Sequence, residues 1–210
     1  LVLNDNNLGP EAGKLIAAAL PGLTGLQGLV LNDNNLGPEA GKLIAATLPK
    51  LTGLQRLGLS SNDLGLEARS AITRSMHANM QWLSLAGNSG PEVQDWLNPL
   101  LGKLNRMERL GLADSHLGDL WSMALVGTLI GAQAPLWKLI LSSNNISRAV
   151  VINIIELLKG RYPELQLWIM QQGFSAEDMQ AIRAASDQLQ LKDIPAAAAV
   201  AAPQQHSGGS

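Results

Sequence analysis

The chain has 210 residues, of which 46% are hydrophobic, a formal net charge of -2 and no cysteine. This length suits one domain or a short array of repeats, and the small net charge gives no reason to expect nucleic acid as the main partner. The missing cysteines exclude a disulfide framework and a thiolate metal site, and no apolar run approaches the roughly 20 residues of a membrane-spanning helix.

The first 28 residues form a unit that the chain repeats. Segment 29–56 differs from segment 1–28 at only three positions, where Thr47, Lys50 and Arg56 replace Ala19, Gly22 and Gly28. The head of the unit then returns with more changes, so that units start near residues 1, 29, 57, 83, 110, 139 and 167. A nearly fixed period of this length is typical of a solenoid, in which each unit buries its apolar side against its neighbours.

Each unit begins with a short predicted strand. In the second unit, the alternation of strand side chains places Leu29 and Leu31 inward and Val30 outward. The turn after the strand carries an asparagine, whose amide can both donate to and accept from backbone groups of adjacent turns. These asparagines are Asn6, Asn34, Asn62, Asn88 and Asn144. The fifth and seventh units have Ser115 and Gln172 there, so we expect the weakest hydrogen bonding at these turns.

A predicted helix follows each turn. Pro10 and Pro38 stand where a first helical residue is expected, and an acidic residue follows each proline near the positive end of the helix dipole. The fourth unit aligns only if one residue is deleted within 88–92, which should change the local curvature. Ser175 is the expected cap of one more helix, and Leu189 and Leu191 are expected to form a last short strand.

The repeated pattern resembles the leucine-rich repeats, specifically the long subtype of ribonuclease inhibitor. That family's unit is L-x-x-L-x-L-x-x-N-x-L-G followed by a helix, and it is matched position for position by Leu26, Leu29, Leu31, Asn34, Leu36 and Gly37, and by Leu54, Leu57, Leu59, Asn62, Leu64 and Gly65. The resemblance implies an α/β fold, a right-handed solenoid in a horseshoe arc, with parallel strands on the concave face and helices on the convex face. It says little about function, because such repeats carry many unrelated tasks.

Two regions follow from this pattern. We assign residues 1–194 to a leucine-rich repeat domain. Residues 195–210 are rich in alanine, proline and glycine, a composition typical of a disordered tail or linker. The chain begins at Leu1 in the middle of a motif, and we therefore expect it to be a fragment of a longer protein.

Outward strand positions form columns across the predicted concave face. The column before the first strand leucine contains Arg56, Trp82, Arg109 and Lys138, and the next column ends in Trp168. Arginine and tryptophan are enriched at interface hot spots. We therefore predict a protein-binding site at these five residues.

Small residues stand beside this column, and the column itself also has an explanation without a partner. Gly58, Ser84 and Gly111 are expected to leave room for a partner. Alternatively, the cations protect the strands against aggregation, and Trp82 packs on its neighbours. Trp168 could likewise be covered by the C-terminal segment.

The sequence gives no support for catalysis, a cofactor or a small-molecule substrate. The triplet of Asp114, Ser115 and His116 lies in a single turn, where the repeat pattern alone explains it, and a catalytic relay is defined by spatial geometry. His77 is placed in a helical segment and His206 in the tail, so no metal cluster is expected.

Three functions compete. The first, which we favour, is a scaffold that binds a partner protein through the concave face. The second is a regulator of a small GTPase, although the acidic tail of such regulators is missing here. The third is a ligand-sensing or spacer segment of a larger protein, such as an innate immune receptor or a secreted bacterial effector. We expect a cytoplasmic location, or delivery into a host cell in the effector case, and no partner membrane.

Overall fold

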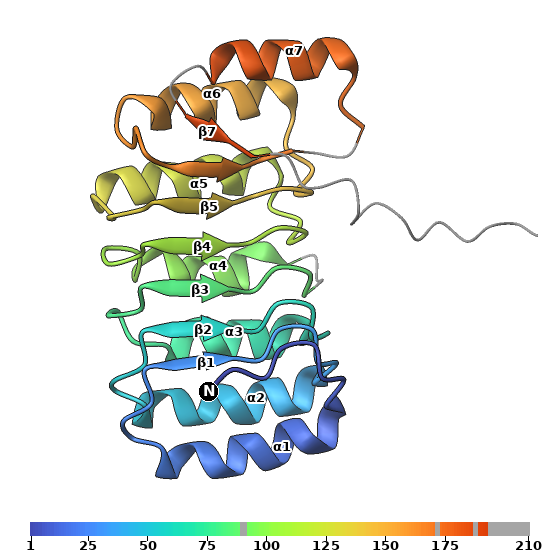
Figure 1. Cartoon of the computed structure of the whole chain (residues 1–210), viewed down its shortest axis with the longest axis vertical. Coiled ribbons are helices and arrows are strands. Elements are labelled where there is room, and N and C mark those ends of the chain that lie inside the picture. The colour runs from blue at the N-terminus through green and yellow to red at the C-terminus, as the bar shows by residue number, and fades with distance from the viewer. Residues whose placement is uncertain (89–91, 171–172, 187–188, 193–210) are drawn as a thin grey trace, which may run out of the picture.

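The computed structural model describes residues 1–88, 92–170, 173–186 and 189–192. Over these ranges, seven α-helices alternate with seven strands of one open sheet, and the strand order follows the chain from β1 to β7. All neighbouring strands are parallel. Figure 1 shows the strands stacked in one layer, with the helices in a second layer behind them.

The elements are short and evenly spaced. The α-helices are α1 (Gly9–Ala19), α2 (Gly37–Thr47), α3 (Gly65–Ser75), α4 (Val93–Leu101), α5 (Gly118–Gly131), α6 (Arg148–Lys159) and α7 (Ala176–Ala185), and two 3₁₀ turns are η1 (Leu20–Gly22) and η2 (Leu48–Lys50). The strands are β1 (Gly28–Val30), β2 (Arg56–Gly58), β3 (Trp82–Ser84), β4 (Arg109–Gly111), β5 (Lys138–Ile140), β6 (Gln166–Trp168) and β7 (Gln190–Leu191). The register pairs equivalent positions of successive units, such as Leu29 with Leu57, which fits a repeat solenoid.

The predicted alternation of strands and helices is confirmed, with one difference at the start of the sheet. The strand expected at Leu1 is reduced to a single bridge between Val2 and Val30. The last strand, expected around Leu189 and Leu191, is present as β7 and pairs with β6. The sheet therefore reaches seven strands from β1 to β7.

The turn after each strand explains the recurring D-N-N-L-G sequence. Asp33, Asn35 and Gly37 have φ values of 57°, 52° and 73°, and the equivalent residues of other units have similar positive values. This left-handed region is unfavourable for most L-residues, but glycine enters it freely, and asparagine and aspartate are tolerated there. The turn therefore favours these residue types at every second position, although Ser61, His116 and Ser143 also adopt this conformation.

The asparagine ladder is present in the structure. Asn62 is fully buried; its Oδ1 accepts from the backbone N–H groups of Asn34 and Leu36 at 3.2 and 3.3 Å, and its Nδ2 donates to the carbonyl of Leu31 at 2.8 Å. Ser115 is also buried, and the hydrogen bond that its Oγ makes among the described residues stays within its own turn, to the carbonyl of Ala113 at 3.3 Å. The expectation that the fifth unit has the weakest turn stays a prediction, and Gln172 lies outside the described residues.

Close helix packing depends on one position in the second turn of each early helix. A Cβ atom built on Gly41 of α2 would lie 2.8 Å from the Cβ of Ala68 and 2.8 Å from a methyl of Leu64, both on the side of α3. Gly13 of α1 is similarly crowded by Ala40. Glycine at this position therefore allows successive helices to approach each other.

The third unit places Arg69 at the same position, and a buried cation results. The guanidinium carbon of Arg69 lies 4.1 Å from the ring centroid of Trp96 in α4, and one terminal nitrogen donates to the carbonyl of Asn88. Among the described residues, its Nε and its other terminal nitrogen have no hydrogen-bond partner. Burial lowers the pKa of Arg69 to about 10. The arginine and tryptophan together fill the space between α3 and α4.

The helix termini agree with the sequence. Pro10 and Pro38 lie in the first turns of α1 and α2. Ser175 caps α7, and its hydroxyl accepts from the backbone N–H of Asp178, whose carboxylate in turn accepts from the N–H of Ser175. The deletion expected within 88–92 and the tail at 195–210 fall on positions 89–91 and 193–210, which lie outside the described residues.

Candidate functional site

One row of side chains crosses the sheet from β1 to β6. Neighbouring strands pair residues at the same position of each unit, in the order Gly28, Arg56, Trp82, Arg109, Lys138 and Gln166. The strand leucine that follows each of them is fully buried, as Leu57 and Leu110 illustrate. Because side chains alternate along a strand, this row lies on the sheet face opposite the helices. We call these six residues the basic row.

Two tryptophans of this face lie beneath cations. The guanidinium carbon of Arg109 is 4.8 Å from the ring centroid of Trp82 on the adjacent strand, and the Nζ of Lys138 is 5.0 Å from that of Trp168. Cations at such distances are attracted to the negative face of an aromatic ring. Trp82 and Trp168 are both half-buried. The part of each tryptophan that is buried packs on the neighbouring cation, as the alternative explanation proposes for Trp82.

In the part of the chain that the structure describes, the cations of the basic row form no ion pair with an acidic residue; these cations are Arg56, Arg109 and Lys138. Burial lowers the pKa of Arg109, and burial together with the nearby charge of Arg109 lowers the pKa of Lys138. Arg109 and Lys138 are therefore partly dehydrated, and together with the exposed Arg56 they form a positive surface that attracts anionic groups.

A hollow of about 260 Å³ opens beside the middle of the basic row. It is lined by Arg56, Trp82, Arg109, Gln81, Glu108 and Trp137. The last three precede β3, β4 and β5, and their backbones continue the register, since Trp137 N–H donates to the carbonyl of Glu108 at 2.9 Å. The sequence did not point to these three residues, because the predicted columns start with the first residue of each strand and these residues come just before it. Trp137, with 44% of its surface exposed, adds a second accessible indole to the site.

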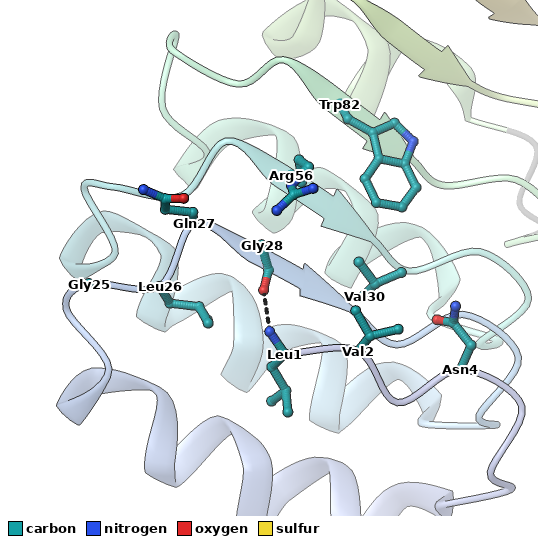
Figure 2. Close-up of a pocket in the computed structure, with 10 residues that line it drawn as sticks. All are labelled: Leu1, Val2, Asn4, Gly25, Leu26, Gln27, Gly28, Val30, Arg56 and Trp82. Carbon is teal, nitrogen blue, oxygen red and sulfur yellow. Dashed lines mark hydrogen bonds between the residues drawn. The ribbon is translucent and has the colours of Figure 1, made fainter.

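A second hollow, of about 420 Å³, lies at the β1 end of the same face. Figure 2 shows Arg56 and Trp82 on one side of it, and Val2, Val30 and Gly28 along its base. Arg56 and Trp82 line both hollows. The two hollows are therefore neighbours on one surface that runs across the strands.

The small residues beside the basic row do not leave the expected room. A Cβ on Gly58 would lie 2.8 Å from a methyl of Val30 and 3.0 Å from the Oδ1 of Asn32. A Cβ on Gly111 would lie 2.8 Å from the Oγ of Ser84. Neighbouring side chains occupy this space, which also explains why Val30 is buried although it points outward. The prediction of open space at these glycines was wrong.

The structure separates the members of the turn triplet. Asp114 and His116 line a shallow hollow together with Ser143 and Asn145, whereas Ser115 is buried in the ladder. His77 lies in the loop after α3, not in the predicted helical segment, and its Nε2 is 3.1 Å from the carbonyl oxygen of Leu48. Histidines, aspartates and glutamates form no group of three suited to a metal ion in the described segments. Within the same segments, no helix has the length and apolar character to cross a membrane.

Comparison with known protein families finds no match for this sequence, and comparison with curated proteins finds none either. The five predicted site residues lie on neighbouring strands of the sheet. Four of them lie in the basic row, and Trp168 lies in the adjacent column, where Lys138 contacts it.

Proposed function

We propose that this chain is a leucine-rich repeat protein of the ribonuclease-inhibitor-like type that binds an acidic segment of a partner protein. In this proposal the solenoid is right-handed, the basic row lies on its concave face, and the helices lie on its convex face. The repeated motif and the single layer of helices behind the parallel sheet support the assignment.

One observation carries the proposed binding: three cations stand in register on one face, with no carboxylate partner among the described residues. Neighbouring strands are about 4.8 Å apart, so Arg56 and Lys138, three strands from each other, span about 14 Å. An acidic loop, strand or helix can present carboxylates over such a distance. Arg109 and Lys138 are already partly dehydrated. Water therefore screens the attraction between these cations and an incoming carboxylate less than it would screen the attraction to fully exposed cations.

The tryptophans supply contact area at the same place. Trp82 stands between Arg56 and Arg109 in the row, and Trp137 projects at the margin of the hollow that these residues line. Tryptophan and arginine dominate hot spots; both bury a large area, and the rigid indole of tryptophan loses little conformational entropy on binding. Trp82 is therefore the proposed anchor of the interface.

Selection from a random 12-residue peptide library displayed on phage tests this proposal. We expect enrichment of acidic sequences, and we expect the selected peptides to lose affinity for Arg109→Glu. Lys50→Glu is the matched control, because Lys50 is an exposed cation in η2 that lines the hollow between α1 and α2, away from the basic row. Peptides without acidic enrichment, or equal affinity for both variants, would exclude the proposed site.

A further inference from the structure

The hollow beside the middle of the basic row is lined mainly by flat side-chain groups. Four of its six lining residues carry an indole or a guanidinium, and the other two carry a carboxylate and an amide; the six are Trp82, Trp137, Arg56, Arg109, Glu108 and Gln81. Indoles pack against other aromatic rings, and the planar guanidinium stacks on aromatic faces. An aromatic ring is therefore the group that most of this lining favours.

The sheet holds this lining in place. Glu108 N–H donates to the carbonyl of Gln81 at 2.8 Å, and Trp137 N–H donates to the carbonyl of Glu108 at 2.9 Å, so these three residues stand side by side just before their strands. The volume of about 260 Å³ lies below the roughly 300–1,000 Å³ of pockets that enclose drug-sized ligands. The hollow therefore suits a single side chain of a partner better than a small molecule.

Glu108 gives the hollow a hydrogen-bond acceptor beside the rings. It is half-buried and forms no ion pair within the described ranges. Its carboxylate would repel an acidic side chain placed in the hollow, but it can accept a hydrogen bond from a hydroxyl group. Tyrosine carries a phenolic O–H on an aromatic ring and is neutral near pH 7. It therefore matches both parts of the lining, whereas phenylalanine matches only the flat groups.

We propose that this hollow takes a tyrosine side chain of the acidic partner segment. The ring packs against Trp82 and Trp137, and the phenolic O–H donates to the carboxylate of Glu108. This inference rests on the proposed function, because the acidic residues on either side of the tyrosine are the ones that the cations bind. It adds a requirement that the cations alone do not impose, namely an uncharged aromatic residue inside the acidic segment.

The spacing of the basic row sets the positions of the acidic residues around the tyrosine. Because strands lie about 4.8 Å apart, Trp82 and Arg109 are about 5 and 10 Å from Arg56 along the row, and Lys138 is about 14 Å away. An extended peptide rises about 3.3 Å per residue, and every second side chain lies on the same face. With a glutamate over Arg56, the side chain two residues later lies about 7 Å along the row, between Trp82 and Arg109. The side chain two residues further lies about 13 Å along it, near Lys138. The expected segment is therefore Glu-x-Tyr-x-Glu.

Three synthetic peptides with a fluorescent label test this inference on the intact chain. They are Gly-Glu-Gly-Tyr-Gly-Glu-Gly and the same peptide with phenylalanine or serine in place of tyrosine. We expect the tyrosine peptide to bind at least about tenfold more tightly than the serine peptide, because burial of a large side chain is favourable on this scale. We expect it to bind at least about threefold more tightly than the phenylalanine peptide, because the phenol adds one hydrogen bond. Fluorescence anisotropy at one low ionic strength measures the three dissociation constants.

Substitutions in the hollow should remove these preferences one at a time. Trp137→Ala should fold, because 44% of the surface of Trp137 is exposed, and it should reduce the preference for tyrosine over serine by at least about threefold. Glu108→Ala should bind the tyrosine and phenylalanine peptides equally. Leu120→Ala is the matched control for Trp137, because Leu120 is 74% exposed and lies in α5, in the helix layer behind the sheet. This control should keep both preferences.

The outcomes separate this inference from the proposed function. Equal binding of the tyrosine and serine peptides by the unmodified chain, with weaker binding of both by Arg109→Glu, would overturn the inference and leave the acidic site in place. A preference for tyrosine over serine that is unchanged in Trp137→Ala would also overturn it, as would a phenylalanine peptide that binds as tightly as the tyrosine peptide. If the unmodified chain binds none of the three peptides, both the inference and the proposed function are wrong.

Discussion

The guanidinium of Arg109 lies over the ring of Trp82, with 4.8 Å between its carbon and the ring centroid, and the two residues are paired across β4 and β3. This contact fixes the indole and the cation relative to each other. Packing between neighbours and partner binding are therefore compatible, because an ordered pair has less conformational freedom to lose when a partner arrives.

Substitution of Trp82 should mainly change the binding affinity, whereas substitution of Arg109 should mainly change the association rate. For a peptide selected on this face, Trp82→Ala should lose more than about 2 kcal/mol of binding free energy, as expected of a hot-spot tryptophan. Arg109→Glu should slow association most strongly at low salt, because long-range attraction is screened as ionic strength rises. Surface plasmon resonance at two salt concentrations measures both effects. A reduced association rate that is the same at both salts would contradict the electrostatic explanation.

The asparagine ladder predicts a ranking of two stability changes. Asn62→Ala should lower the free energy of unfolding by about 1–3 kcal/mol, because backbone groups of Asn34, Leu36 and Leu31 would lose their partner inside the protein. Ser115→Ala should lower it less, since Ser115 Oγ makes one hydrogen bond, at 3.3 Å, among the described residues. Urea titrations of the two variants measure the difference. The reverse ranking would disprove the structural role of the ladder.

Two helical glycines should respond to alanine with opposite signs. Gly41→Ala should lower the free energy of unfolding by about 1–3 kcal/mol, because the new Cβ would lie only 2.8 Å from Ala68 and Leu64. Gly127→Ala in α5 should raise it by roughly 0.5–1 kcal/mol, because that position is open and alanine favours the helix. Thermal unfolding of both variants tests the pair. Equal effects would show that the helices do not pack as closely as the structure indicates.

The buried Arg69 should be replaceable by an apolar residue of similar length. Burial lowers the pKa of Arg69 to about 10, so below this pH the folded state holds a charge that the unfolded state accommodates more easily. The resulting loss of stability is complete at neutral pH and decreases only as pH rises above about 10. Arg69→Met should therefore raise the free energy of unfolding at pH 7 by about 1 kcal/mol or more. A decrease in urea titrations would show that the contacts with Trp96 and Asn88 outweigh the buried charge.

Much of this architecture follows from the repeat, because each unit imposes the same local requirements. The left-handed turn favours residues such as Asp33 and Gly37, and the buried asparagine requires backbone partners in the preceding turn. The members of the basic row also follow from the sequence, since parallel register places equivalent residues side by side.

The shape of the site could not be predicted from the repeat pattern of the sequence. Whether a glycine leaves a hollow depends on where the neighbouring side chains turn, as Gly28 and Gly58 illustrate. Trp137 escaped notice because it precedes its strand, where no periodic signal distinguishes it from a loop residue. Sequence periodicity thus predicts which residues share a row, but not which surface they leave open.

The serine in the fifth turn has a consequence for how the molecule opens. Asn34, Asn62 and Asn88 link the first four units through side-chain bonds to the preceding turn, and Asn144 links the sixth unit to the fifth. At Ser115 no such bond to the fourth unit is present among the described residues. In a repeat protein each unit contacts only its neighbours. We therefore expect the boundary between two cooperative unfolding units to lie at this turn. We expect amide hydrogen exchange to report two blocks of protection, one on each side of this turn, with separate opening free energies.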